Sequence, residues 1–210
     1  MTLGKRSTNI FDVQDERRNI MKLSVRTICM VAMFTAIISV LSIMQIPTPW
    51  GVPFTLQTFA MALSGLVLGK KYGTISTVLY VLLGLIGVPV YAGMSAGPGV
   101  LFGVTGGYIF GFVLMTFFCG LGIGFEGKKN GVFFTMLFSI IGLACCHILG
   151  IIQLKVVAQM GWGAAAMAGT VPYLVKDILS VVAAYLVAIA VRKALKSANL
   201  LGANNVSLEN

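Results

Sequence analysis

The stretch VFFTMLFSIIGLACCHILGII, from Val132 to Ile152, decides the fold class because it contains no Asp, Glu, Lys or Arg. A helix of roughly 20 apolar residues is long enough to cross the hydrocarbon core of a bilayer. Continuous apolar runs favour helices over the alternating strands of a barrel. Comparable runs recur along the chain, the second of them shorter than the rest, at about residues 27–46, 55–68, 72–91, 100–123 and 171–191.

The composition supports this interpretation. Of the 210 residues, 58% are hydrophobic and only 10% are charged, and the mean hydropathy is +0.95. A soluble domain has about a quarter of its residues charged, so lipid must solvate much of this chain. The sequence predicts an all-α integral membrane protein with six transmembrane helices. We expect a cytoplasmic N-terminal tail at 1–24, one membrane domain at 25–193 and a cytoplasmic C-terminal tail at 194–210.

The basic residues predict the orientation. The loops at about 47–54, 92–99 and 153–170 contain one cation, Lys155. Positive residues gather on the cytoplasmic side of membrane proteins, so both termini are predicted to be cytoplasmic, in a multi-pass protein of the cell membrane. The same rule explains the net charge of +9 without a nucleic-acid partner. The remaining groups of cations all fall on one side if there are six spans: Lys5, Arg6, Arg17, Arg18, Lys22, Arg26, Lys70, Lys71, Lys128, Lys129, Arg192, Lys193 and Lys196.

Asp177 is the only acidic residue inside any apolar run. A carboxylate within a membrane helix costs a few kcal/mol, so it normally faces a partner or a cavity. We interpret Asp177 as a ligand-binding group near the outer end of the last helix. The alternative is an ion pair with Lys176 at the membrane interface, with the lysine extending outward. Gln57, near the outer end of its run, has an amide that can donate and accept hydrogen bonds.

A glycine-rich segment opens the fourth run, with Thr105 and Tyr108 among its glycines. Small residues let a helix or a ligand approach the backbone closely. The segment lacks the spacing and the lysine of a phosphate-binding loop. In the outer loops, Trp50 and Trp162 fit either interface anchors or a cover folded over a ligand.

Other side chains argue against catalysis. Four cysteines lie inside apolar runs without metal-ligand spacing, and no nucleophilic or paired-carboxylate arrangement is evident. We therefore expect no enzyme activity, no metal and no cofactor, and the missing Walker motif means that a partner must use any ATP. His147 has no second ligand-type residue near it in the sequence. We interpret it as a hydrogen-bonded structural histidine rather than a proton relay.

Several segments, in this order and spacing, resemble the BioY family, the biotin-specific substrate-binding (S) components of energy-coupling-factor (ECF) transporters. The resemblance covers about residues 22–193. The segments are IPTPWGVPFTLQ (46–57), GLVLG (65–69), GLIGVPVY (84–91), GVTGGYIFGF (103–112) and PYLVKD (172–177).

The resemblance implies a six-helix bundle that holds the vitamin near the outer face under loops. It also implies two kinds of partner, a membrane T component and two cytoplasmic ATPase subunits. Ala32 and Ala36 are similar to the family's contact motif for the T component, and Asp177 matches its acidic ligand. On this basis Asp177 and Gln57 are expected at the cyclic urea of biotin, and Lys176 at its carboxylate. Aromatic rings and one hydroxyl complete the expected set: Trp50, Tyr91, Tyr108 and Thr105.

The sequence departs from the family pattern in three places. Ser180 stands where a lysine is usual, Val104 stands where proline is common, and no basic residue lies between Met94 and Val100. Two alternatives therefore stay open. One is an S component for a related small molecule or vitamin. The other is a stand-alone secondary carrier with Asp177 as its proton site, although such carriers are built from repeats and none is evident.

Overall fold

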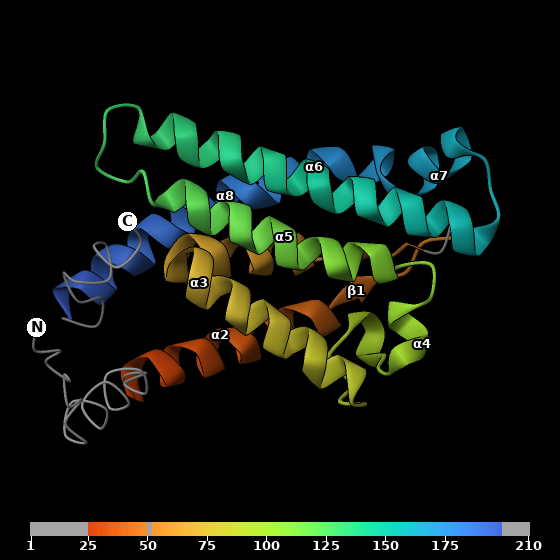
Figure 1. Cartoon of the computed structure of the whole chain (residues 1–210), viewed down its shortest axis with the longest axis horizontal. Helices are drawn as coiled ribbons and strands as arrows, with labels where there is room; N and C mark the ends of the chain where they lie inside the picture. The colour runs from red at the N-terminus through yellow and green to blue at the C-terminus, as the bar shows by residue number, and fades with distance from the viewer. Residues whose placement is uncertain (1–24, 50–51, 199–210) are drawn as a thin grey trace, which may run out of the picture.

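The computed structural model describes residues 25–49 and 52–198, so most of both predicted tails, and Trp50, lie outside the described residues. Within the described ranges, five helices are long and apolar enough to cross a membrane: α2 (Val25–Ile43), α3 (Gln57–Leu85), α5 (Gly106–Ile123), α6 (Gly131–Ala158) and α8 (Val171–Ser197). They lie roughly along one direction (Figure 1). The predicted helical membrane architecture is confirmed. The last helix continues past residue 193, where the membrane domain was expected to end.

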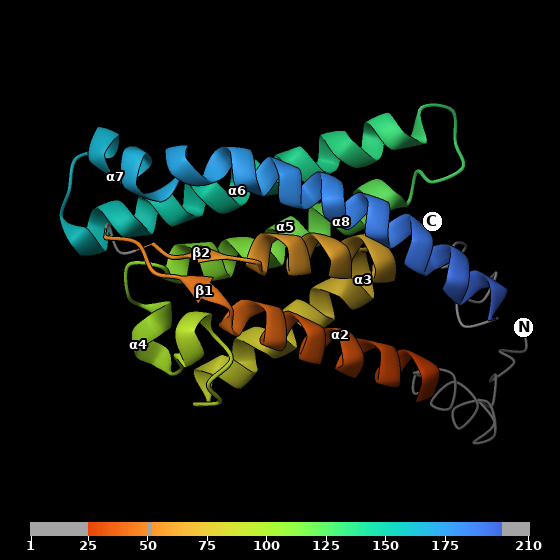
Figure 2. The ribbon, with the colours of Figure 1, turned by 180° about the vertical axis from the view of Figure 1, so that it is seen from behind.

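Helix α3 covers both the second and the third predicted runs. Its backbone leaves helical geometry at Gly69, with φ 79° and ψ 177°, a conformation that only glycine adopts readily. Ser64 and Ser76 hydroxyl oxygens lie 2.7 Å apart, and Gln57 donates to the Tyr80 hydroxyl at 3.0 Å. Residues at similar distances along the chain before and after Gly69 are thus in contact. The chain reverses direction there, as the ribbon in Figure 2 shows.

Close packing joins α3 to α5. Gly65 lies against the main-chain oxygen of Thr116 and the Cβ of Cys119, so a larger residue would not fit without a shift. Thr77 and Thr116 share a hydrogen bond of 3.0 Å between the same two helices. Small residues and hydroxyl groups of this kind hold membrane helices together. They matter because lipid is as apolar as the helix surface, so there is no hydrophobic driving force between helices.

Short elements close one end of the bundle. A two-stranded antiparallel sheet pairs β1 (Gln45–Ile46) with β2 (Phe54–Thr55), a departure from the all-α prediction. The 3-10 helix η1 (Ala92–Met94), α4 (Pro98–Leu101) and α7 (Trp162–Gly169) complete that end. In Figure 2 these elements gather at the end opposite the labelled termini.

The fourth apolar run is not one helix. It is split into α4 and α5 by residues 102–105, and Gln153 of α6 explains the split. The Gln153 amide donates to the main-chain oxygens of Leu101 at 2.8 Å and Gly103 at 2.7 Å. These oxygens are therefore held by a neighbouring helix. Hydropathy shows no sign of this break because the residues on both sides of it are apolar.

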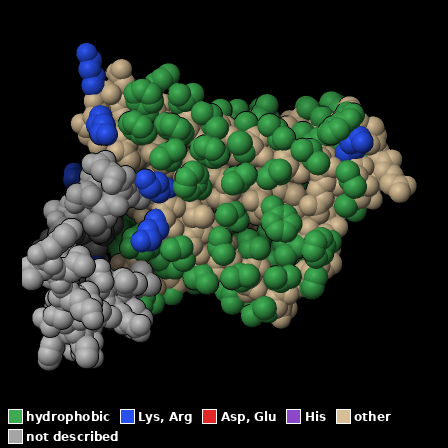
Figure 3. Space-filling model, viewed as in Figure 1, with side chains coloured by type: hydrophobic (Ala, Val, Ile, Leu, Met, Phe, Trp, Pro, Cys, Tyr) green, Lys and Arg blue, Asp and Glu red, His purple; other side chains and the backbone are tan. Residues whose placement is uncertain are grey.

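The outer surface is suited to lipid. Figure 3 shows hydrophobic side chains over the middle of the face in view, with Lys and Arg concentrated toward one end. On α8, large apolar side chains point outward, among them Val175, Leu179 and Leu186, which are 62–70% exposed. Pro172 lies in the first turn of the same helix, where its missing N–H costs nothing.

Candidate functional site

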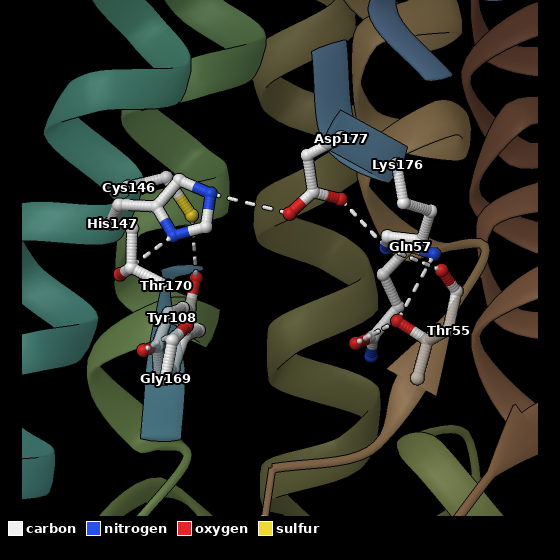
Figure 4. A network of polar contacts seen from close by, with 9 residues as sticks. All are labelled: Thr55, Gln57, Tyr108, Cys146, His147, Gly169, Thr170, Lys176 and Asp177. Carbon is white, nitrogen blue, oxygen red and sulfur yellow. Dashed lines mark hydrogen bonds and ion pairs between the residues drawn. The ribbon is translucent and has the colours of Figure 1, made fainter. Parts of the chain in front are cut away.

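A cavity of about 330 Å³ lies at the end of the bundle where α3, α5 and α8 begin. Its wall is mostly apolar and carries a few polar side chains, the usual character of a small-molecule site. The polar side chains come from separate parts of the chain, as Figure 4 shows for several of them. The sequence-predicted residues Gln57, Tyr91, Thr105, Tyr108, Lys176 and Asp177 all line this cavity.

Asp177 projects from α8 and is 4% exposed. Its Oδ1 lies 2.6 Å from Nζ of Lys176, and its Oδ2 lies 3.2 Å from Nε2 of His147 (Figure 4). Removing a carboxylate from water is costly unless other groups compensate its charge. Two nitrogen-bearing side chains, from α8 and α6, supply that compensation here.

Lys176 connects α8 to the short sheet. Its ammonium group donates to the main-chain oxygen of Thr55 at 2.9 Å, besides meeting Asp177. The ion pair considered from sequence therefore exists, but in the cavity wall rather than at a lipid interface. Because the Lys176 ammonium and the Asp177 carboxylate are adjacent, they face the same part of any bound molecule.

His147 lies on α6, with Nδ1 3.2 Å from Oγ1 of Thr170 and Nε2 beside Asp177. Its ring also meets that of Tyr108 edge to face, with centroids 6.1 Å apart. A structural histidine was predicted, and the contact with Thr170 agrees with that. Sequence alone did not indicate that His147 belongs to the cavity wall, because its neighbour Asp177 is on a different helix.

Gln57 begins α3 and is 7% exposed. Its Oε1 accepts a hydrogen bond from the Thr55 hydroxyl at 3.1 Å, and its Nε2 donates to Tyr80. Both ends of the amide are therefore already held, which fixes the side chain at the cavity wall. Thr105 lies just before the first residue of α5 and lines the same cavity.

Two tyrosines reach the cavity with their hydroxyl groups engaged elsewhere. Tyr108 donates to the main-chain oxygen of Gly169 at 2.7 Å, and Tyr91 donates to that of Val81 at 2.6 Å. Their rings are thus the parts available to an apolar ligand. Tyr91 lies outside the long helices, and burial raises its pKa from 10.0 to about 12. Its hydroxyl therefore stays neutral at physiological pH.

Tyr173, a residue that the sequence did not single out, holds the loop between β1 and β2. Its hydroxyl donates to the main-chain oxygen of Val52 and lies 3.4 Å from Oγ1 of Thr48. Its ring packs against Phe54 at 4.5 Å. Both Val52 and Tyr173 line the cavity, so these contacts make the loop part of its wall. The position of Tyr173 in PYLVKD, four residues before Asp177, was the available signal.

The family model described as the BioY family matches residues 15–197. The chain belongs to the BioY family. Biotin transporter BioY of Thermotoga maritima is 39% identical over 168 residues, which cover 80% of this chain and 96% of that protein. Biotin transporter BioY2 of Lactococcus lactis subsp. cremoris is 32% identical over 173 residues, with 82% and 93% covered.

A solved structure agrees with the fold. The crystal structure of the S-component for biotin from an ECF-type ABC transporter superposes with a TM-score of 0.69 at 27% identity. The match covers 82% of this chain and 92% of that one. The resemblance to the BioY family, inferred from the order and spacing of the sequence segments, is thus confirmed.

In this BioY-family chain, Ala32 and Ala36 are exposed on one face of α2 and lie outside the cavity wall. Ser180, which stands where the family usually has lysine, is also not part of that wall. No group of three or more His, Cys, Asp or Glu that could hold a metal ion occurs within residues 25–49 and 52–198.

Proposed function

We propose that this BioY-family protein is the biotin-binding S component of an ECF-type transporter. It captures biotin at the outer face of the cell membrane, and partner subunits drive import with ATP. The names of its relatives and of the matched crystal structure support this function. The single observation that carries it is the buried carboxylate of Asp177 in the wall of a mostly apolar cavity.

The chemistry of the cavity fits biotin. The cyclic urea of biotin has two N–H groups, and a carboxylate accepts such hydrogen bonds strongly because the acceptor is charged. The Tyr91 and Tyr108 rings supply apolar surface for the bicyclic ring system. The volume of about 330 Å³ lies within the range of small-molecule pockets, about 300–1,000 Å³. Lys176 neutralises Asp177, so that the urea meets an ion pair rather than an isolated charge.

The membrane arrangement that we propose has six spans with both termini in the cytoplasm. The reversal at Gly69 supports counting α3 as two spans. The basic residues at one end of the bundle support a cytoplasmic location for that end, since only Lys155 lies in the loops at the other end. The cavity then opens on the outer side.

Import is proposed to need a membrane T component and two ATPase subunits, because this chain contains no Walker motif. Vesicles that contain the protein alone should bind biotin without accumulating it, and vesicles with the partners and ATP should accumulate it. Accumulation against a gradient by the protein alone would favour a secondary carrier instead.

The direct test is calorimetric titration of biotin into the purified protein and its Asp177→Asn variant. We expect tight binding that weakens more than about tenfold in the variant, or about 1.4 kcal/mol. Ser180→Ala is the matched control, one helical turn further along α8 and outside the cavity wall, and it should bind as the wild type does. Unchanged affinity in Asp177→Asn would remove Asp177 from the site. A folded wild type that ignores biotin would direct the search to a related ligand.

A further inference from the structure

Two polar atoms in the cavity wall are buried without a hydrogen-bond partner, Nε2 of His147 and Oδ1 of Asp177. Both approach a neighbour closely, at 3.2 Å and 2.6 Å, but neither contact has the angles of a hydrogen bond. A buried polar atom left unsatisfied costs about 1–3 kcal/mol, so it calls for an explanation. Among the described residues only one other side-chain atom shares this condition, the hydroxyl oxygen of Ser42.

The contacts around His147 assign the position of its hydrogen. Nε2 faces a carboxylate oxygen of Asp177, and two lone pairs at 3.2 Å would repel each other. The hydrogen is therefore assigned to Nε2, and Nδ1 accepts from the Thr170 hydroxyl. The edge-to-face contact with Tyr108 further fixes the plane of the imidazole.

The side chains around His147 come from α5 and α8. The charged side chains that meet this ring or its partner are Asp177 and Lys176, both from α8, and they neutralise each other. From α5 the ring meets Tyr108, whose hydroxyl is engaged with Gly169. Oδ2 of Asp177 lies 3.2 Å from Nε2, and the unsatisfied Oδ1 is the other oxygen of the same carboxylate, 2.6 Å from Nζ of Lys176.

We propose that His147 determines ligand specificity by donating its Nε2–H to the carbonyl oxygen of the ligand, while Asp177 accepts the adjacent N–H. A donor beside an acceptor matches a carbonyl oxygen beside an N–H group when both are attached to the same carbon atom, as in a cyclic urea. The assignment rests on the proposed function, because it names the group that recognises the ureido carbonyl. It gives each of the two unsatisfied atoms a partner when ligand is bound.

The test compares two ligands and two proteins. In 2-iminobiotin the carbonyl oxygen is replaced by an imino group, which when protonated donates hydrogen bonds and does not accept them. His147→Phe keeps an aromatic ring against Tyr108 and removes the donor. We expect wild type to prefer biotin strongly. In His147→Phe, biotin affinity should fall about tenfold while 2-iminobiotin affinity stays the same, so the preference shrinks by that factor.

Two further variants guard against a folding defect. His147→Gln retains an N–H donor and should keep part of the preference, whereas Thr170→Val removes the group that fixes the tautomer and should reduce it. Cys145→Ala, next to His147 in sequence but outside the cavity wall, should change neither affinity. All variants are first compared with wild type by thermal unfolding.

The outcomes separate the two proposals. Equal losses for both ligands in His147→Phe, or no loss, would overturn the role of His147 while leaving biotin as the ligand. If His147→Phe does not fold, the other two variants decide. The role of His147 would be overturned if Thr170→Val keeps the wild-type preference for biotin while His147→Gln loses it. A folded wild type that binds no biotin would overturn the proposed function, and this assignment with it.

Discussion

The ammonium group of Lys176 donates a hydrogen bond to the main-chain oxygen of Thr55, with Nζ 2.9 Å from that oxygen. The same group lies 2.6 Å from Oδ1 of Asp177. One side chain therefore joins the carboxylate of the cavity to the short sheet beside it. Strand β2 and the carboxylate of the site are thus linked through Lys176.

Replacing Lys176 by methionine should weaken biotin binding by more than about tenfold and speed its dissociation. The variant keeps the aliphatic part of the side chain but leaves Asp177 without its cation and β2 without its link to α8. Breaking a buried ion pair on one side is strongly destabilising, although partial exposure of Lys176 reduces the cost here. Dissociation rates and thermal unfolding measure the two effects. Lys155→Met is the control, because Lys155 lies over the Trp162 ring outside the cavity wall.

Gly65→Ala should lower the free energy of unfolding by about 1–3 kcal/mol, the usual cost of overpacking. The added Cβ would lie 2.9 Å from Cβ of Cys119 and would also meet the main-chain oxygen of Thr116. Gly163→Ala is the matched control, since open space surrounds that position on α7. It should leave stability unchanged or raise it slightly, because alanine favours helix more than glycine does. A melting temperature that falls no further in Gly65→Ala than in Gly163→Ala would contradict the packing argument.

Tyr91→Phe should make the free energy of unfolding fall less steeply as the pH rises from 10 to 12. The pKa of Tyr91 is about 12 in the folded protein and 10.0 for the free side chain. The unfolded chain thus loses its proton first, and the wild type loses stability as pH rises from 10 to 12. The variant lacks this contribution and, at neutral pH, is less stable by about 1 kcal/mol because it has no hydrogen bond to Val81. Unfolding profiles that run parallel above pH 10 would exclude this role for Tyr91.

Leucine at both Ala32 and Ala36 should abolish co-purification with the T component without changing biotin affinity. The two alanines are exposed one turn apart on α2, away from the cavity wall, so larger side chains there would separate the subunits and not disturb the site. Ala183→Leu, an equal change at an exposed position of α8, serves as control. A complex that survives the double substitution would place the contact elsewhere.

Hydropathy predicted the helices well because lipid demands long apolar segments. It predicted neither the break at residues 102–105 nor the β1–β2 pairing. The break depends on the Gln153 amide, which holds Leu101 and Gly103 from another helix. The identity of that partner cannot be read from residues 100–123 alone.

The candidate site was predictable where a residue conflicted with its surroundings. Asp177 stood out as an acid in an apolar run, and the structure places it in the cavity wall. His147 did not stand out, because a single histidine in an apolar helix is common and its neighbours Thr170 and Asp177 lie 23 and 30 positions later. Lys176 was expected at the carboxylate of the ligand, which stays a prediction, and the structure places its ammonium group 2.6 Å from Asp177.

The packing beneath the cavity has a consequence for transport. One turn deeper along the helices that form the cavity wall, Met61, Met115 and Val181 are completely buried. Below them four further residues are also inaccessible and are hydrogen-bonded in two pairs, Ser64 with Ser76 and Thr77 with Thr116. These buried side chains close the inner end of the cavity. A molecule held there has no passage through this layer toward the opposite end of the bundle while the layer keeps this packing.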